Sequence, residues 1–296
     1  MDIRRLQAFC QVYILRSFSK AGEALQLSQP TISAHVLALE DEIGMPLFDR
    51  LGRVILPTQA GEVLFTHAQA VFDELEQARV ALLALTDRVA GELAIGGSTI
   101  PAHYIIPKLA ARFHAAFPEV RLRLEVGDTQ EITEQVLDGR VLVGLVGGPT
   151  PLPELECRPF LDDALELVAP RALPVPDLTG NDWRERLLSL PWIMREPGSG
   201  TQRALVRAGD EAACPLRSIV PVLTVHSSLA ALECVDAGLG VAVVSHLAAR
   251  AYLDRGTVAR LATPHLPMRR QFYTVHHARR GESPALAAFL EACGSI

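Results

Sequence analysis

The stretch SFSKAGEALQLSQPTISAHVLALEDEIGMPLFDR, residues 17–50, determines the expected fold of the first part of this chain. It predicts two short helices that are joined by a tight turn and followed by a β-wing. Ala21, Ala24 and Leu25 fall on one side of the first helix, where small side chains allow a second helix to cross closely. The arrangement is that of a helix-turn-helix, although a helical hairpin that only packs would show the same pattern.

The second helix has a clear start and a clear apolar stripe. Ser28 stands where an N-cap belongs, and Pro30 falls in the first turn, where a proline is tolerated. Apolar residues recur at spacings of four and three and predict a buried stripe made of Ile32, Val36 and Leu39. The helix N-terminus is then free to enter a major groove. The DNA contacts expected from this helix are Gln29, Pro30, Thr31 and Ser33.

Four short motifs within the first sixty-odd residues resemble the winged helix-turn-helix of LysR-type transcriptional regulators. They are Ser28–Ser33, Leu39-Glu40, Leu47–Arg50 and Thr58–Gly61. The resemblance implies a DNA-binding domain over residues 1–60 and makes Arg50 and Arg53 on the wing candidates for phosphate contacts. The family usually has a basic residue where Ala34 stands and often another at Leu37, and neither is present here.

The charge balance places a limit on how this domain would bind DNA. The whole chain carries a formal net charge of −6, and residues 1–60 contain six basic and six acidic side chains. Affinity must therefore come from a local arrangement of arginines, helix N-termini and dimeric contact, because there is no bulk positive charge.

Composition indicates a globular protein with room for two or three domains in its 296 residues. No apolar run reaches the length of a membrane span and no secretory signal is evident, so we expect a cytoplasmic protein without a membrane partner. The five cysteines are widely spaced and none forms a Cys-x-x-Cys pair. They are expected to be reduced core thiols and not a disulfide framework or a zinc site.

A long helix over about residues 62–88 follows the wing, within an expected linker segment of residues 61–90. Its apolar residues alternate steps of four and three: Leu64, Ala68, Val71, Leu75, Ala78, Leu82 and Leu85. Such a heptad seam favours pairing with a second copy of the helix, and Leu64, Val71, Leu75 and Leu82 are the expected dimerisation residues. Packing of an ordinary amphipathic helix on its own domain is the alternative. The helix should stop near Ala90-Gly91.

From Gly91 onward strands alternate with helices in two similar cycles, which predicts parallel sheets in two α/β lobes. The first cycle comprises Glu92–Gly97, Pro101–Phe117, Val120–Val126, Thr129–Leu137 and Val141–Val146. The second comprises Trp192–Arg195, Thr201–Ala213, Val220–Val225, Ser228–Ala237 and Val241–Val244.

Two stretches, Leu165–Ala169 and Gln271–His276, are expected to be strands that cross between the lobes, and helix Pro284–Cys293 should return to the first lobe. Lobe I would cover about residues 91–162 and 268–296, and lobe II about residues 163–267. This plan resembles the periplasmic solute-binding proteins and is the effector domain, residues 91–296, that the LysR-type resemblance implies.

Small hydroxylated residues and glycines gather at the ends of the predicted strands, where ligands of open α/β sheets bind. Helix N-termini carry partial positive charge and hydroxyls add donors, so these ends suit a small oxyanion or carboxylate. The candidate effector-binding residues are Ser98, Thr99, Thr129, Gly147, Ser199 and Thr201. For any one of the hydroxyls, a plain N-cap is the alternative role.

The LysR-type resemblance implies ligand contacts at the positions of Ser98, Thr99, Thr129 and Thr201. Arg195–Thr201, Ser98–Pro101 and Gly127–Thr129 are also similar to the branch of the family that regulates inorganic sulfur use and carbon fixation. Arg195 could be a counter-ion of the ligand or could pair with Glu196. His226 and His103 are weaker candidates.

Motifs of catalysis are absent from the sequence. There is no phosphate-binding Gly-x-x-x-x-Gly-Lys loop, no nucleophile elbow and no His-Glu-x-x-His spacing, so no enzyme, cofactor or metal site is predicted. The expected protein is a promoter-binding regulator that responds to a small anionic effector, and the resemblance implies a homodimer or homotetramer. Two alternatives remain: an anion-binding protein whose N-terminal helices serve assembly, and an α/β enzyme that acts on a carboxylated substrate.

Overall fold

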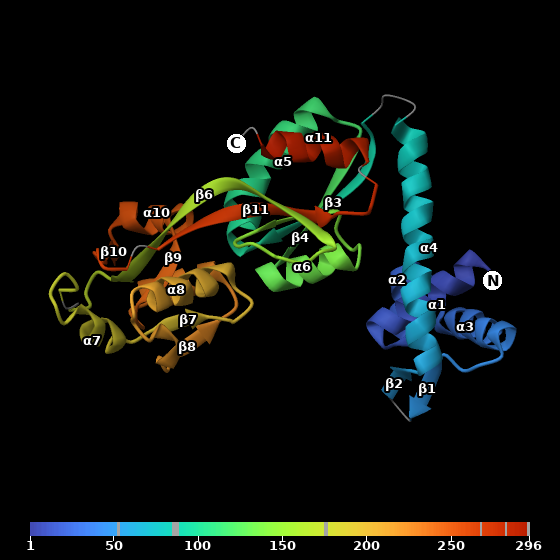
Figure 1. Cartoon of the computed structure of the whole chain (residues 1–296), viewed down its shortest axis with the longest axis horizontal. Helices are drawn as coiled ribbons and strands as arrows, with labels where there is room; N and C mark the ends of the chain where they lie inside the picture. Colours follow the sequence, from blue (N-terminus) through green and yellow to red (C-terminus); the bar gives the residue numbers. More distant parts are fainter. Residues whose placement is uncertain (52–53, 85–88, 175–176, 267, 282, 295–296) are drawn as a thin grey trace. The chain divides into compact units, whose positions relative to one another are not determined.

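The computed structural model describes residues 1–51, 54–84, 89–174, 177–266, 268–281 and 283–294. The chain divides into two compact units, Met1–Leu82 and Leu83–Ile296. Figure 1 shows the helical N-terminal unit with its small hairpin, and the two-lobed C-terminal unit. Within the described residues no helix is long and apolar enough to cross a membrane.

The N-terminal unit is a winged helix-turn-helix that continues into a long helix. Its elements are α1 (Ile3–Leu15), α2 (Phe18–Leu25), α3 (Gln29–Ile43), the hairpin β1 (Phe48–Leu51) and β2 (Val54–Pro57), and α4 (Gln59–Ala84). As predicted, Ser28 is the N-cap of α3, with its Oγ accepting from Thr31 N at 3.3 Å, and Pro30 lies in the first turn. The predicted stripe of Ile32, Val36 and Leu39 is fully buried.

Of the small residues expected to let the second helix cross α2 closely, Ala24 does not take part, and a glycine shapes the turn between α2 and α3. Ala24 is exposed, and the buried residues of α2 are Phe18, Ala21 and Gly22. A Cβ on Gly22 would lie 2.7 Å from Leu27 O, so this glycine is what allows the turn to fold back on the helix. The expectation for Ala24 was wrong because the close approach is made at Gly22, where the backbone of the turn folds back on the helix.

Helix α4 begins at Gln59, three residues earlier than expected, after Thr58, whose Oγ1 accepts from Gly61 N at 3.1 Å. Its first apolar residues pack on their own unit: Ala68 is buried and Leu64 is half-buried against the same cluster. Val71 and Leu75 are 42% and 45% exposed. The side chain of Leu82 and the whole of Leu85 lie outside the described residues, as do residues 85–88 of the predicted helix.

The C-terminal unit holds the remaining elements in two α/β lobes. Lobe I contains β3 (Gly91–Ser98), α5 (Ile106–Ala116), β4 (Val120–Gly127), α6 (Thr129–Leu137), β5 (Val143–Val146) and α11 (Pro284–Cys293). Lobe II contains α7 (Trp183–Leu188), β7 (Ile193–Arg195), α8 (Gly200–Glu211), β8 (Leu223–Val225), α9 (Ser228–Asp236), β9 (Ala242–Ser245), α10 (His246–Arg255) and β10 (Val258–Arg260). As predicted, α11 packs on lobe I, against α5 and β3.

Two long antiparallel strands, β6 (Leu155–Pro170) and β11 (Arg269–His277), connect the lobes, and Figure 1 shows them running side by side. One sheet has the order β10-β6-β11-β5-β3-β4, with β9 also paired to β6. The pairs β3–β4 and β3–β5 are parallel, as alternation of strands and helices predicts. In lobe II, β7 and β8 are also parallel. The predicted crossover Leu165–Ala169 is only the second half of β6, whose first half pairs with β11.

Two other predicted elements differ in detail. The helix expected over Pro101–Phe117 consists of a π-helical turn, Pro101–Ile105, followed by α5. Pro107 lacks an N–H and removes one bond of the α-helical ladder, which accounts for the irregular start. The strand expected from Val220 begins only at Leu223, and Val220 itself is 90% exposed.

Candidate functional site

The predicted DNA-reading residues lie at the start of α3. Gln29 and Pro30 are exposed, and Thr31 and Ser33 are half-buried. The hydroxyls of Ser28 and Thr31 share a hydrogen bond of 2.8 Å, which orders the first turn. Ala34 and Leu37, where the family usually carries basic residues, are both exposed. The partial positive charge of this helix end, with its exposed polar side chains, forms a surface suited to phosphate or base edges.

The wing is attached to α3 by Glu40. Its Oε1 accepts from Leu47 N at 2.7 Å and from Phe48 N at 3.3 Å, so the carboxylate fixes the first strand of the wing to the reading helix. Strands β1 and β2 pair antiparallel, with Arg50 opposite Ile55. Arg53 lies outside the described residues, and only the backbone of Arg50 is described. Their predicted phosphate contacts remain predictions.

The C-terminal unit brings most of the predicted effector residues together between the lobes. A small polar cavity of about 10 Å³ has a lining that includes Ser98, Thr99 and Thr129 from lobe I and Ser199, Thr201 and Ser228 from lobe II. The hydroxylated residues from both lobes therefore face one another. Gly147 adjoins this cavity, and its N–H donates to Thr129 Oγ1 at 3.3 Å.

The capping alternative is correct for only part of this set. Ser199 is the N-cap of α8, with its Oγ accepting from Gln202 N. The cap of α6 is Asp128, which forms a capping box with Glu131. Thr129 is therefore not the cap of its helix, and its hydroxyl is turned to the neighbouring strand end.

Arg195 is buried at the cavity and is engaged by lobe II. Its Nε and Nη2 donate to the Glu196 carboxylate at 2.8 and 2.6 Å, and Nη1 donates to Ser228 Oγ. A longer bond of 3.4 Å joins Nη2 to Thr99 Oγ1 in lobe I. Of the two roles that the sequence left open for Arg195, the structure contains the ion pair with Glu196. His103 Nδ1 lies 2.6 Å from Thr99 O, and neither His103 nor His226 lines the cavity.

A second buried arginine, Arg270 on β11, was not identified from the sequence. Its Nε donates to Asp163 Oδ2 at 2.8 Å, and its Nη1 donates to Thr201 Oγ1 at 2.9 Å. The Nη2 atom is buried and makes no hydrogen bond within the described part of the chain. Burial lowers the pKa of this guanidinium, and the Asp163 carboxylate opposes that shift. A buried donor without an acceptor is costly, so Nη2 marks a position where an anion would be stabilised.

The lobes touch directly beside Arg270. A Cβ on Gly200 would lie 2.4 Å from Gly147 O, and a Cβ on Gly198 would lie 2.1 Å from Asp128 Oδ2. The glycines of Glu196–Thr201 therefore serve a close approach of backbone to backbone. Because the cavity holds about one water-sized group, a larger ligand would require the lobes to separate.

Comparisons with known proteins agree on both units. Residues 3–62 match the family described as bacterial regulatory helix-turn-helix protein, lysR family, and residues 86–295 match the LysR substrate binding domain. The chain is 33% identical to the RuBisCO operon transcriptional regulator of Allochromatium vinosum, over 98% of this chain and 95% of that protein. It is 32% identical to the uncharacterized HTH-type transcriptional regulator YeiE of Escherichia coli K12, over 99% and 97%.

Solved structures show the same fold. The full-length regulator CbnR in complex with its target DNA superposes with a TM-score of 0.65, at 21% identity, and covers 99% of both chains. The regulatory domain of CcmR from Synechocystis PCC6803, in complex with 2-PG, has a TM-score of 0.59 at 24% identity, over 69% of this chain and 96% of that one. The predicted combination of a winged helix-turn-helix and a two-lobed effector domain is thus confirmed, as is the similarity to carbon-fixation regulators.

Proposed function

This chain belongs to the LysR family of bacterial transcriptional regulators, and we propose that its effector is a small oxyanion or carboxylate held between the lobes. The observation that carries this proposal is the buried Nη2 of Arg270, which lacks an acceptor in the described residues. Asp163 and Glu196 already engage much of Arg270 and Arg195, so the position favours one small anion over a larger one with several charged groups. The relative CcmR was solved in complex with 2-PG, which is consistent with an anionic ligand.

The hydroxyls around Arg270 would complete the binding site. Thr129 and Thr201 come from opposite lobes, and each already takes part in a hydrogen bond at the cavity. An anion that accepted from Arg270 Nη2 and from these hydroxyls would contact both lobes at once. Binding would then favour one arrangement of the lobes over another, which is how a ligand can change the state of a regulator. No catalytic step is assigned to the site.

In this proposal the N-terminal unit reads DNA as a dimer, in the cytoplasm. Gln29, Pro30, Thr31 and Ser33 contact the major groove, and Arg50 and Arg53 contact phosphates. The exposed Val71 and Leu75 of α4 pair with a second copy of the helix, together with Leu82, while Leu64 is partly used by its own unit. The family resemblance favours a homotetramer made of two such dimers.

Footprinting tests the DNA-binding half of the proposal. The full chain is incubated with the promoter regions that adjoin its own gene, with and without sulfate, phosphate, sulfite and simple carboxylates. Protection of a specific segment whose extent changes with one anion is expected. Protection without any sequence preference would support the alternative in which the N-terminal helices serve only assembly.

A further inference from the structure

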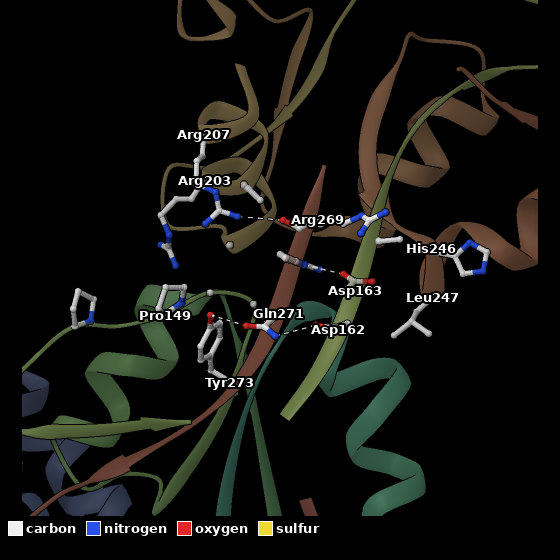
Figure 2. Close-up of a pocket in the computed structure, with 17 residues that line it drawn as sticks. Pro149, Asp162, Asp163, Arg203, Arg207, His246, Leu247, Arg269, Gln271 and Tyr273 are labelled. Atoms are coloured by element: carbon white, nitrogen blue, oxygen red, sulfur yellow. Dashed lines mark hydrogen bonds and ion pairs between the residues drawn. The ribbon is translucent and has the colours of Figure 1, made fainter. Parts of the chain in front are cut away.

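A second and much larger hollow lies next to the crossover strands, and Figure 2 shows its lining residues. Its volume is about 1020 Å³, about one hundred times that of the inter-lobe cavity. Its walls are α8, the exposed sides of β6 and β11, the start of α10 and the loop after β5. We call this hollow the arginine groove, after Arg203 and Arg207 on α8 and Arg269 on β11.

The exposed face of β11 contributes to the arginine groove alone, while Arg270 on its buried face lines both the groove and the inter-lobe cavity. Successive side chains of a strand point to opposite faces. On β11 the exposed residues are Arg269 and Gln271, and the buried ones are Arg270 and Phe272. Arg270 therefore directs its guanidinium to the buried face, toward Thr201, while Arg269 and Gln271 face the groove. The two hollows meet at Gly200 and Arg270, which line both, and only the groove is lined by Arg269 and Gln271.

Positive charge in the groove exceeds the nearby negative charge. Arg203 and Arg207 are four residues apart on α8 and so project from one face. Their short contacts are to carbonyl oxygens: Arg203 Nη1 donates to Gly198 O at 3.0 Å, and Arg207 Nη2 to Arg269 O at 3.1 Å. The side chain of Arg269 has no ion pair within the described residues.

The acidic side chains near the groove offset the charge of these arginines only in part. The Asp128 carboxylate acts on Arg203 through its charge, without an ion pair between the two in the described residues. Asp163 pairs with the buried Arg270, and Asp162 accepts from Gln271 Nε2 at 2.9 Å. Glu211 approaches Arg207 only to 3.9 Å, between two exposed side chains. An exposed pair at that distance is weak. Guanidinium groups with free donors bind phosphate and carboxylate through two parallel hydrogen bonds, which makes them suited to a multiply charged anion.

The opposite wall of the groove is less polar. Pro149 and Tyr273 lie across from the arginines in Figure 2, and Leu247 adds an apolar side chain at the lobe II end. Pro151 also lines the groove. A volume near 1000 Å³ is at the upper end of the range for small-molecule sites. We propose that the arginine groove binds an organic anion with at least two negative charges, a phosphorylated or multiply carboxylated metabolite, as a second ligand besides the inter-lobe anion.

Calorimetric titration of the full chain tests this proposal, with citrate and inorganic pyrophosphate as probes at 0.15 M ionic strength. We expect one probe molecule per chain and a dissociation constant below about 1 mM for at least one of them. The double variant Arg207→Gln/Arg269→Gln should weaken that binding at least tenfold. Ala164→Glu, which adds a carboxylate to the exposed lining, should have the same effect without removing any hydrogen bond.

The matched control is Arg171→Gln/Arg250→Gln, which removes the same charge from exposed positions of lobe II outside the groove. The affinity of this control for the probe should stay within twofold of the unmodified chain. The same is expected of Thr201→Val, because Thr201 lines the inter-lobe cavity and not the groove. Unchanged binding in both groove variants, a loss in Thr201→Val, or no binding of either probe would each overturn the proposal. If the inter-lobe proposal alone is wrong, sulfate and similar small anions will not bind, while the results expected with citrate and pyrophosphate will still be obtained.

Discussion

Arg270 and Asp163 form a buried ion pair across the two strands that join the lobes, with 2.8 Å between Nε and Oδ2. Asp163 Oδ1 also accepts from Ser245 Oγ at 2.6 Å, which ties the pair to lobe II. Because both groups are removed from water, each depends on the other for compensation of its charge. The pair holds the Arg270 side chain at the lining of the inter-lobe cavity, and its buried Nη2 has no acceptor in the described residues.

Replacement of Arg270 by methionine should therefore affect both stability and ligand binding. Loss of one partner of a buried pair typically costs about 3–5 kcal/mol of unfolding free energy. The double variant Asp163→Asn/Arg270→Met should lose less than the sum of the two single variants, because it leaves no uncompensated charge. Chemical denaturation measures the unfolding free energies of the single variants and of the double variant. Additive losses in this cycle would show that the two side chains do not interact.

Gly200→Ala should reduce anion affinity by pushing the lobes apart. The added Cβ would lie 2.4 Å from Gly147 O, and that atom belongs to the backbone and cannot rotate away. Gly148→Ala is the matched control, since its Cβ would meet only Arg203 Nη2, at an ordinary 3.5 Å. Anion affinities measured by calorimetry should fall for Gly200→Ala alone. Equal affinities in the two variants would refute the role of this backbone contact.

Glu40→Ala should weaken promoter binding although Glu40 lies away from the start of α3. The substitution leaves the N–H groups of Leu47 and Phe48 without their carboxylate acceptor, at a cost of about 1–3 kcal/mol for a group that stays buried. The wing would then lose its fixed position on α3. Gel-shift titrations should show weaker binding for Glu40→Ala and little change for Glu42→Ala, whose carboxylate is exposed. A comparable loss in both variants would contradict the account.

Ser33→Arg should damage sequence-specific recognition, because a long charged side chain at this half-buried position of α3 would alter how the helix sits in the groove. Binding to a nonspecific duplex should change less than binding to the operator. A competition gel shift separates the two affinities. Normal operator affinity in this variant would remove Ser33 from the reading surface.

Two cysteines should resist alkylation in the folded chain. Burial raises the pKa of Cys10 and of Cys293 to about 12, so almost no thiolate is present at pH 8. Iodoacetamide followed by mass spectrometry should leave both unmodified until the chain is unfolded in urea. Rapid labelling of either thiol in the native chain would show that its surroundings are more open than described.

Local signals in the sequence were sufficient for much of the fold. Ser28, Pro30 and the stripe of Ile32, Val36 and Leu39 follow from helix capping and periodicity, which depend on neighbours in the sequence. The grouping of Ser98, Thr129 and Thr201 could be expected because strand ends in α/β sheets converge. These predictions required no knowledge of which side chains meet across the cleft.

Long-range pairing could not be read in the same way. Arg270 and Asp163 are 107 residues apart, and nothing in the sequence specifies that β6 and β11 pair in the register that joins them. Both residues lie just outside the predicted crossover strands Leu165–Ala169 and Gln271–His276. Charged residues beside a strand that enters a core were the available signal, since such a strand rarely carries an unpaired charge. The start of β8 at Leu223 and the exposed Ala24 likewise depend on packing.

The most direct test of the inter-lobe proposal is thermal unfolding of the full chain with sulfate, sulfite, thiosulfate, phosphate and small carboxylates, repeated with Thr201→Val. A specific anion at one hundred times its dissociation constant stabilises by about 2.7 kcal/mol, which corresponds to roughly 5–11 °C for a unit of this size. We predict such a shift with one of these anions and its loss in Thr201→Val. An equal shift in the variant, or no shift with any anion, would contradict the proposal.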